Sequence, residues 1–270
     1  MSKLLAVEHL QVTWKKDRKV LVQDVSFSLE KGESLVILGQ SGSGKTMTCY
    51  SIMGLLDARR FRVEGGVSFA GKNLLTCSGK EKREIYGGTI AMIPQNPMTA
   101  FDPSMRIGKQ MTQTLALHTG QKKDALQTRV NEALQAAGLD DPERICASYP
   151  YTLSGGMLQR VMIAMALMVN AKLIVADEPT TALDVAHRNA TVDAFIQLRE
   201  QGAAVLLVTH DFAVAAQLGG RLLVMKEGIV LERGEVNQVL QHPESEYTKA
   251  LLKAARLSGH CWNKREELLC

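Results

Sequence analysis

The sequence has no long apolar run among its 270 residues. Because a helix needs about 20 consecutive, mainly apolar residues to cross a bilayer, no segment is predicted to span a membrane. The opening stretch MSKLLAVEHLQVTW meets a charge at Glu8 before a long apolar segment can build up, so we expect no signal peptide.

Paired cysteines and a strong net charge are also missing. The five cysteines include no C-x-x-C pair, which predicts reduced thiols in a cytosolic protein. The formal net charge of +4 is too small to argue for a nucleic acid partner, and it agrees only weakly with work beside an anionic membrane. The composition, 46% hydrophobic and 22% charged, is that of a globular protein with enough apolar material for a core.

Strand-like and helix-like segments alternate along the chain. Residues 10–14 alternate between apolar and polar side chains, which is typical of a half-buried antiparallel strand, and Arg221–Arg233 predicts a hairpin that turns at Glu227-Gly228. The predicted fold class is therefore α/β, with a parallel-sheet core and an N-terminal antiparallel part. Four short runs are apolar throughout, as in parallel strands buried on both faces: Ser34–Gly39, Thr89–Pro94, Leu173–Ala176 and Ala203–Val208.

A mostly helical insertion is expected between the buried strands. In residues 124–139 the apolar positions fall on one helical face, and Gly138 provides a stop. The predicted division has three parts: a core with the antiparallel part at 1–98 and 161–235, a helical subdomain at 99–160, and a C-terminal tail at 236–270.

The segment GQSGSGKT matches the phosphate-binding pattern G-x-x-x-x-G-K-[ST], between a buried strand and a helix expected from Thr46 to about Leu56. In such a loop the glycines let backbone N–H groups surround phosphate oxygens, and the helix N-terminus adds partial positive charge. We expect Lys45 to reach the β- and γ-phosphates of ATP and the Thr46 hydroxyl to bind Mg²⁺. The alternative is a chance glycine-rich turn. The candidate ATP-binding residues are Gly39, Gln40, Ser41, Gly42, Ser43, Gly44, Lys45, Thr46 and Thr48.

Two carboxylates, Asp177 and Glu178, follow the buried run LIVA. Successive side chains at a strand end point opposite ways, so Asp177 can hold Mg²⁺ while Glu178 deprotonates the attacking water. Gln95 and His210 close two further strands, at the sheet edge where such folds bind ligands. We expect Gln95 at the Mg²⁺ and water and His210 near the γ-phosphate. Singly, each is more often a structural residue, and an Asp-Glu pair can be merely solvated.

A second glycine turn, LSGGMLQR, heads the apolar helix Met157–Val169. It offers a hydroxyl and backbone amides to an anion, but it has neither a lysine nor a Mg²⁺ ligand. We therefore interpret it as half of a site that a second molecule completes. Two chains facing head to tail would hold ATP between the lysine loop of one and the serine-glycine turn of the other. The residues assigned to this turn are Leu153, Ser154, Gly155, Gly156, Met157 and Gln159.

The combination of these motifs resembles the ATP-binding cassette (ABC) ATPases over residues 4–252. It comprises GQSGSGKT, Gln95, LSGGMLQR, LIVADE, the triplet Ala182-Leu183-Asp184 and His210. The resemblance implies a P-loop ABC ATPase fold with a RecA-like core, and glycine turns that pair across a dimer. It also implies that Trp14 stacks on adenine, for which edge-strand packing is the alternative, and that Ala182, Leu183 and Asp184 couple the two sites.

Finer details are similar to the peptide/nickel importer ATPases: the Met of SGGMLQR, the stretch NPMTAFDPSMRIGKQM and the stretch HPESEYTKALL. That resemblance implies ATP and Mg²⁺ as ligands and a second, similar ABC ATPase subunit. It also implies two membrane permeases, an extracytoplasmic binding protein that delivers substrate, and a peripheral position on the cytoplasmic face of the inner membrane. An iron–sulfur cluster needs about four thiolates, and beyond residue 240 only Cys261 and Cys270 occur, so we expect none.

Several functions stay open on the sequence alone. The short tail and GMLQR favour nickel, cobalt or a metallophore complex as cargo, with di- or oligopeptides as the alternative. A non-transport ABC ATPase is a second class, although members in repair carry long coiled coils and members acting on ribosomes are usually tandem. A P-loop kinase or GTPase leaves LSGGMLQR unexplained and lacks the motif N-K-x-D.

Overall fold

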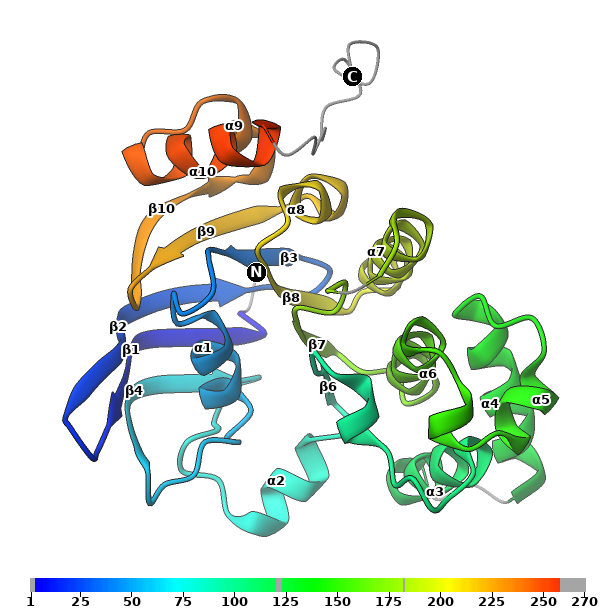
Figure 1. Ribbon diagram of the computed structural model, residues 1–270. Coiled ribbons are helices and arrows are strands. Elements are labelled where there is room, and N and C mark those ends of the chain that lie inside the picture. Colours follow the sequence, from blue (N-terminus) through cyan, green and yellow to red (C-terminus); the bar gives the residue numbers. More distant parts are fainter. Residues whose placement is uncertain (1–2, 120–122, 182, 258–270) are drawn as a thin grey trace. The chain divides into compact units, whose positions relative to one another are not determined.

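The computed structural model describes residues 3–119, 123–181 and 183–257, which form two compact units (Figure 1). One unit combines residues 1–77 with 204–270, and the other comprises residues 78–203. Three residues named above, Ala182, Cys261 and Cys270, lie outside the described residues.

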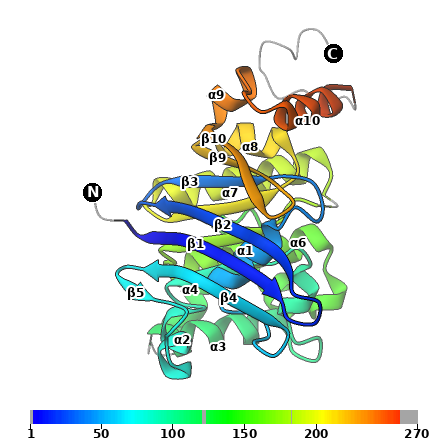
Figure 2. The ribbon, with the colours of Figure 1, turned by 90° about the vertical axis from the view of Figure 1, so that its left-hand side faces the viewer.

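An antiparallel sheet forms the N-terminal part of the first unit. Its strand order is β2-β1-β4-β5, and Figure 2 shows β1, β2 and β4 side by side. The register between β1 and β4 shifts between Glu8 and Gln11, where Gly65 has a φ of 100°. A Cβ at Gly65 would lie 2.6 Å from the carbonyl oxygen of Glu8, so only glycine fits this bulge. The strands are β1 (Leu5–Trp14), β2 (Lys19–Leu29), β4 (Phe61–Phe69) and β5 (Lys72–Asn73).

The second sheet of this unit contains the buried strands that the apolar runs predict. β3 (Ser34–Leu38) pairs in parallel with β8 (Ala204–Thr209) and with β9 (Arg221–Lys226). β9 then pairs antiparallel with β10 (Ile229–Glu235), which confirms the predicted hairpin. The helices of the unit are α1 (Lys45–Ile52), α8 (Phe212–Leu218), α9 (Val236–Gln241) and α10 (Glu246–Leu257).

The second unit contains two parallel strands and most of the helices. β6 (Ile90–Ile93) pairs in parallel with β7 (Leu173–Asp177). β7 is buried throughout and extends one residue beyond its predicted run, whereas β6 is fully buried only at Ile90 and Ile93. The helical segments are α2 (Gly79–Ile85), η1 (Pro97–Ala100), α3 (Ile107–Thr119), α4 (Lys123–Ala136), α5 (Pro142–Ala147), η2 (Pro150–Thr152), α6 (Gly155–Met168) and α7 (Val185–Glu200).

The predicted helices occur, with shifted ends. α1 ends at Ile52 rather than near Leu56, because Gly54 takes a φ of 61° and leaves the helical conformation. α6 begins at Gly155, two residues before the predicted start, because the Ser154 hydroxyl accepts a hydrogen bond of 3.2 Å from the Met157 N–H and caps the first turn. None of the helices in the described ranges is both long and apolar enough to cross a membrane.

Candidate nucleotide site

The loop between β3 and α1 holds the lysine of the phosphate-binding pattern. The Lys45 side chain is only 4% exposed, and its Nζ donates hydrogen bonds to the carbonyl oxygens of Gly39 at 2.7 Å and Gln40 at 2.9 Å. The Lys45 ammonium group therefore contacts the main chain of its own loop. A ligand with phosphate oxygens at this loop would compete with two main-chain carbonyls for the same three N–H donors.

Glycines give this loop its shape. A Cβ at Gly39 would contact the Met225 carbonyl oxygen and lie 2.6 Å from Ser43 Oγ, and Gly44 has a φ of 101° with the Leu21 carbonyl oxygen 2.9 Å from its Cβ position. The Ser43 hydroxyl is buried and finds no hydrogen-bond partner in the described residues. A tight glycine loop with an unpaired hydroxyl and a lysine fits a phosphate group.

The other predicted residues of the loop differ in exposure. Gln40, Ser41 and Gly42 are exposed, whereas Thr46 is half-buried at the start of α1. Thr48 is fully buried, and its hydroxyl donates to the Gly44 carbonyl oxygen at 3.0 Å. The Thr48 side chain thus supports the first turn of α1 from inside.

Trp14 and His210 belong to the same unit as this loop. Trp14 is the half-buried last residue of β1, where it pairs with Lys19 on β2 and Phe61 on β4. His210 is exposed and follows β8 directly. The next residue, Asp211, caps α8 by accepting a hydrogen bond of 2.7 Å from the Ala213 N–H.

The paired carboxylates lie in the second unit, at the end of β7. Asp177 is its last residue and is 1% exposed; Glu178 is 8% exposed and has a φ of 49°. The Thr181 hydroxyl donates to Glu178 Oε2 at 3.0 Å. Two carboxylates held under so little solvent fit the sequence-based expectation of a Mg²⁺ ligand and a general base.

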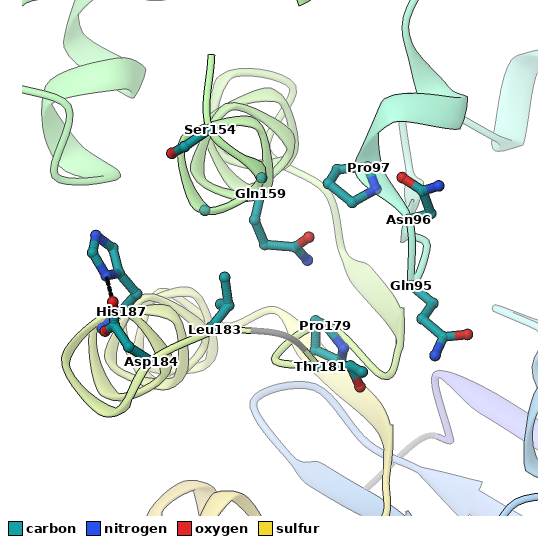
Figure 3. A pocket seen from close by; sticks show the side chains of 12 residues that line it. Gln95, Asn96, Pro97, Ser154, Gln159, Pro179, Thr181, Leu183, Asp184 and His187 are labelled. Atoms are coloured by element: carbon teal, nitrogen blue, oxygen red, sulfur yellow. Dashed lines mark hydrogen bonds and ion pairs between the residues drawn. The ribbon is translucent and has the colours of Figure 1, made fainter. Parts of the chain in front are cut away.

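The second glycine turn opens a cavity of about 580 Å³ in the same unit (Figure 3). Of the residues assigned to that turn, Leu153 is buried and Met157 half-buried, while Ser154 and Gly155 are exposed. The cavity joins the turn to the segment after β6 and to the turn before α7. Its lining residues are Gln95, Asn96, Pro97, Ser154, Gly155, Gly156, Gln159, Pro179, Thr181, Leu183, Asp184 and His187.

Asp184 and His187 form one wall of this cavity. The Asp184 carboxylate caps α7 by accepting from the His187 N–H at 2.9 Å, and its second oxygen lies 2.7 Å from His187 Nδ1. The main-chain and ring bonds from His187 hold the pKa of the Asp184 carboxyl below its usual value. Asp184 thus stays ionised beside the glycine turn throughout the neutral range.

Within the second unit, the structure therefore brings together Gln95, the Ser154–Gly156 turn, Gln159, Leu183 and Asp184. Trp14, the lysine loop and His210 belong to the first unit. Sequence reasoning missed Asn96, Pro97 and His187. Asn96 and Pro97 follow Gln95 directly, but nothing in the sequence pairs His187 with Gly156, whose Cβ position lies 3.5 Å from the His187 ring.

Comparison with known proteins identifies the family. The ABC transporter family model matches residues 22–181. The metal-staphylopine import system ATP-binding protein CntD of Staphylococcus aureus is 44% identical over 254 residues, covering 94% of this chain and 93% of that protein. The dipeptide transport ATP-binding protein DppD of Haemophilus influenzae is 39% identical, covering 93% of this chain and 77% of its own length.

Solved structures agree with this result. The ATP-binding cassette MJ0796, in a dimeric post-hydrolysis state bound to ADP and Pi, matches with a TM-score of 0.76 and 28% identity over 86% of this chain and 98% of its own. CbiO1 of Clostridium perfringens matches the fold with a TM-score of 0.75 at 24% identity, over 95% of this chain and 96% of its own. The mixed α/β fold is thus confirmed as that of an ABC cassette. The chain belongs to the ABC transporter family, as an ATP-hydrolysing subunit of the importer kind.

Proposed function

We propose that this chain powers import of nickel or cobalt, or of a complex between such a metal and a metallophore. The observation that supports this choice of cargo is the match to the metal-staphylopine ATPase, which extends over almost the full length of both proteins at 44% identity. The peptide importer ATPases match at 39–40% identity and extend beyond the aligned region. Di- or oligopeptides are therefore the second candidate cargo.

The lysine loop is assigned to the phosphates of ATP. The glycine geometry, the unpaired Ser43 hydroxyl and the buried Lys45 support this assignment. When ATP binds, the Lys45 ammonium exchanges the carbonyls of Gly39 and Gln40 for β- and γ-phosphate oxygens. The remaining loop residues, Ser41, Gly42, Gly44 and Thr46, supply backbone N–H groups, and Trp14 stacks on the adenine.

Three oxygen-bearing side chains are assigned to Mg²⁺: Thr46, Asp177 and Gln95. Hydroxyl, carboxylate and amide oxygens are the hard donors that this ion prefers. Mg²⁺ neutralises charge on the β- and γ-phosphates when it is bound there. Near-complete burial of Asp177 agrees with this role, because buried carboxylates in proteins are commonly paired or bound to metals.

Glu178 is assigned as the general base, with His210 beside the γ-phosphate. Glu178 accepts a proton from water while the water oxygen bonds to the γ-phosphorus and the bond from that phosphorus to the ADP oxygen breaks. Burial and the hydrogen bond from Thr181 support this role, since they hold the carboxylate in one orientation. His210 contributes a ring N–H to the departing phosphate.

The Ser154–Gly156 turn is assigned to the ATP held by a second, similar subunit in a head-to-tail dimer. Ser154 and Gly155 line the cavity and are exposed, which supports an outward-facing role. Leu183 and Asp184, with Ala182, are assigned to the contact that couples the two sites. The dimeric form of the related cassette MJ0796 agrees with such an arrangement.

The assembly proposed around this dimer contains two membrane permeases and an extracytoplasmic binding protein, with no nucleic acid. The chain itself would sit peripherally on the cytoplasmic face of the inner membrane and carry no iron–sulfur cluster. The division into a core, a helical subdomain at 99–160 and a tail also stays a prediction.

Transport by the reconstituted complex tests the proposal. We expect proteoliposomes with the permeases, both ATPase subunits and the binding protein to take up radioactive nickel or cobalt with a metallophore when ATP is supplied. Dipeptides in excess should not compete. Uptake of dipeptides without metal uptake would contradict the proposed cargo. Failure of the ATPase to copurify with any permease would favour a non-transport ABC ATPase instead.

A further inference from the structure

Gln159 is a buried glutamine on α6 whose side-chain N–H groups donate to no acceptor among the described residues. It is 2% exposed, and its Nε2 finds no hydrogen-bond partner among the described residues. Figure 3 shows the side chain reaching from α6 into the cavity, on the side that faces Pro97 and Pro179. Because buried donors in folded proteins are nearly always paired, this amide points to an acceptor that arrives in another state.

The surroundings narrow the choice of acceptor. Asn96 already accepts through its side chain from the Met98 N–H at 3.1 Å and through its carbonyl from the Thr99 hydroxyl at 2.7 Å. Thr181 directs its hydroxyl to Glu178. Gln95 lines the same cavity, and its side-chain oxygen accepts no hydrogen bond from the residues that the structure describes. α6 packs against η1, the segment that directly follows Gln95 and Asn96, so donor and acceptor lie on or beside contacting elements of one unit.

We propose that Gln159 is a positioning residue, whose Nε2 donates a hydrogen bond to an oxygen of Gln95 when ATP occupies the site of its own chain. Gln159 lies in the first turns of α6, and the Ser154–Gly156 turn forms the N-terminus of the same helix. A displacement of Gln159 would therefore displace the turn with it. The hydrogen bond would thus couple ATP binding in this chain's own site to the position of the turn that covers ATP in the partner's site. The inference rests on the proposed roles of Gln95 and of the Ser154–Gly156 turn.

This role differs from a direct contact with the partner's nucleotide, which the sequence motif suggests for Gln159. A side chain that is 98% covered and turned toward Pro97 and Pro179 does not present its amide to a second molecule. The two roles predict different coupling. A positioning bond acts through Gln95, whereas a contact across the dimer acts independently of it.

A double-mutant cycle in the assembled transporter tests the inference. The variants are Gln159→Leu, Gln95→Leu and the double variant, in this subunit only. We expect Gln159→Leu to lower kcat about 10-fold while the KM for ATP stays within about 2-fold, because the lysine loop is untouched. Gln159→Glu keeps the shape but replaces the donor with an acceptor, so it should lose as much activity. Gln197→Leu, at an exposed glutamine on α7, should change nothing.

The double variant decides the outcome. If the Gln159 amide works through Gln95, then the double variant should be no slower than Gln95→Leu alone. Fold losses that multiply would overturn the inference, as would wild-type kcat in both Gln159→Leu and Gln159→Glu. Thermal unfolding of each variant checks folding, and Gln159→Glu serves if Gln159→Leu unfolds. Failure of the proposed role of Gln95 is distinguishable, because Gln95→Leu alone would then keep the wild-type kcat.

Discussion

The Thr181 hydroxyl donates a hydrogen bond of 3.0 Å to Oε2 of Glu178, so the turn after β7 holds the carboxylate at the end of that strand. Glu178 and Thr180, two residues further along the chain, are each 8% exposed. A carboxylate oriented in this way can take a proton from a positioned water.

Replacement of this carboxylate by an amide should separate binding from turnover. Glu178→Gln keeps the shape and can still accept the Thr181 hydrogen bond, but it removes the base. We expect ATP affinity to stay normal while the hydrolysis rate falls about 10²–10⁴-fold. Phosphate release from the purified complex measures the rate, and size-exclusion chromatography with ATP and Mg²⁺ should reveal a trapped dimer. Near-normal turnover would remove Glu178 from the catalytic role.

Loss of the lysine ammonium should instead weaken nucleotide binding. Lys45→Ala removes a charge-assisted contact to the phosphates worth about 1.5–3 kcal/mol, which corresponds to roughly 10- to 150-fold in Kd. Isothermal titration with a non-hydrolysable ATP analogue measures this change. Lys31→Ala, at an exposed turn of the same unit, is the control and should bind normally. Unchanged affinity in Lys45→Ala would mean that residues 39–46 are not the phosphate cradle.

A charge placed in the second glycine turn should disable the partner's site rather than its own. A Cβ at Gly156 would meet Leu183 at 3.4 Å and His187 at 3.5 Å, which are ordinary contact distances. The carboxylate of Gly156→Asp would face the partner's γ-phosphate, where like charges repel strongly. We expect ATP binding at this chain's own loop to persist while occlusion of nucleotide at the partner's loop is lost.

The matched control for this charge is Gly156→Asn, which has nearly the same shape and no charge. It should keep much of the occlusion that Gly156→Asp loses. Occlusion is measured in a mixed complex with a wild-type partner, as labelled ATP retained after rapid gel filtration. Normal occlusion at the partner's loop, with collapse of binding at this chain's own loop, would contradict the head-to-tail dimer.

Gly108 should resist replacement by alanine although it lies inside helix α3. Glycine to alanine in an open helix gains about 1 kcal/mol. At Gly108, however, the new Cβ would lie 2.7 Å from the Cys146 Cβ and 3.0 Å from its carbonyl oxygen. We expect Gly108→Ala to lower the free energy of unfolding by about 1–3 kcal/mol. Urea unfolding measures the change, and Gly79→Ala in α2, where nothing lies within 4 Å, should not destabilise.

The sequence predicted well the central strands and the position of residues 39–46 between a buried strand and a helix, because these segments depend on local chemistry. β3 and β8 are apolar at almost every position and buried on both faces, so any reading of hydrophobicity finds them. The glycines of residues 39–46 likewise follow from local geometry, since Gly42 and Gly44 take φ values of 81° and 101°. The predicted helix at residues 124–139 corresponds to α4, where Leu126, Val130 and Leu134 are buried.

The antiparallel sheet was predicted only in part, because its irregularities depend on contacts between distant segments. β1 begins at Leu5, but a bulge beside His9, which has a φ of 50°, interrupts the alternation of apolar and polar residues before Leu10. β4 carries Gly65-Gly66 in its interior, which reads as a turn in the sequence alone. Burial of Gln159 also depends on tertiary packing, since a glutamine in an otherwise apolar helix reads as a solvent-facing residue.

The left-handed backbone at Glu178 has a consequence for the evolution of this chain. A residue other than glycine held at a φ of 49° costs about 1–3 kcal/mol, and glycine or asparagine at this position would relieve most of that strain. A laboratory screen that rewards heat resistance alone should therefore enrich replacements at position 178. Under the catalytic role proposed for Glu178, the survivors would tolerate higher temperatures and still bind ATP, but they would no longer hydrolyse it. Thermostability and transport would then oppose each other at a single residue.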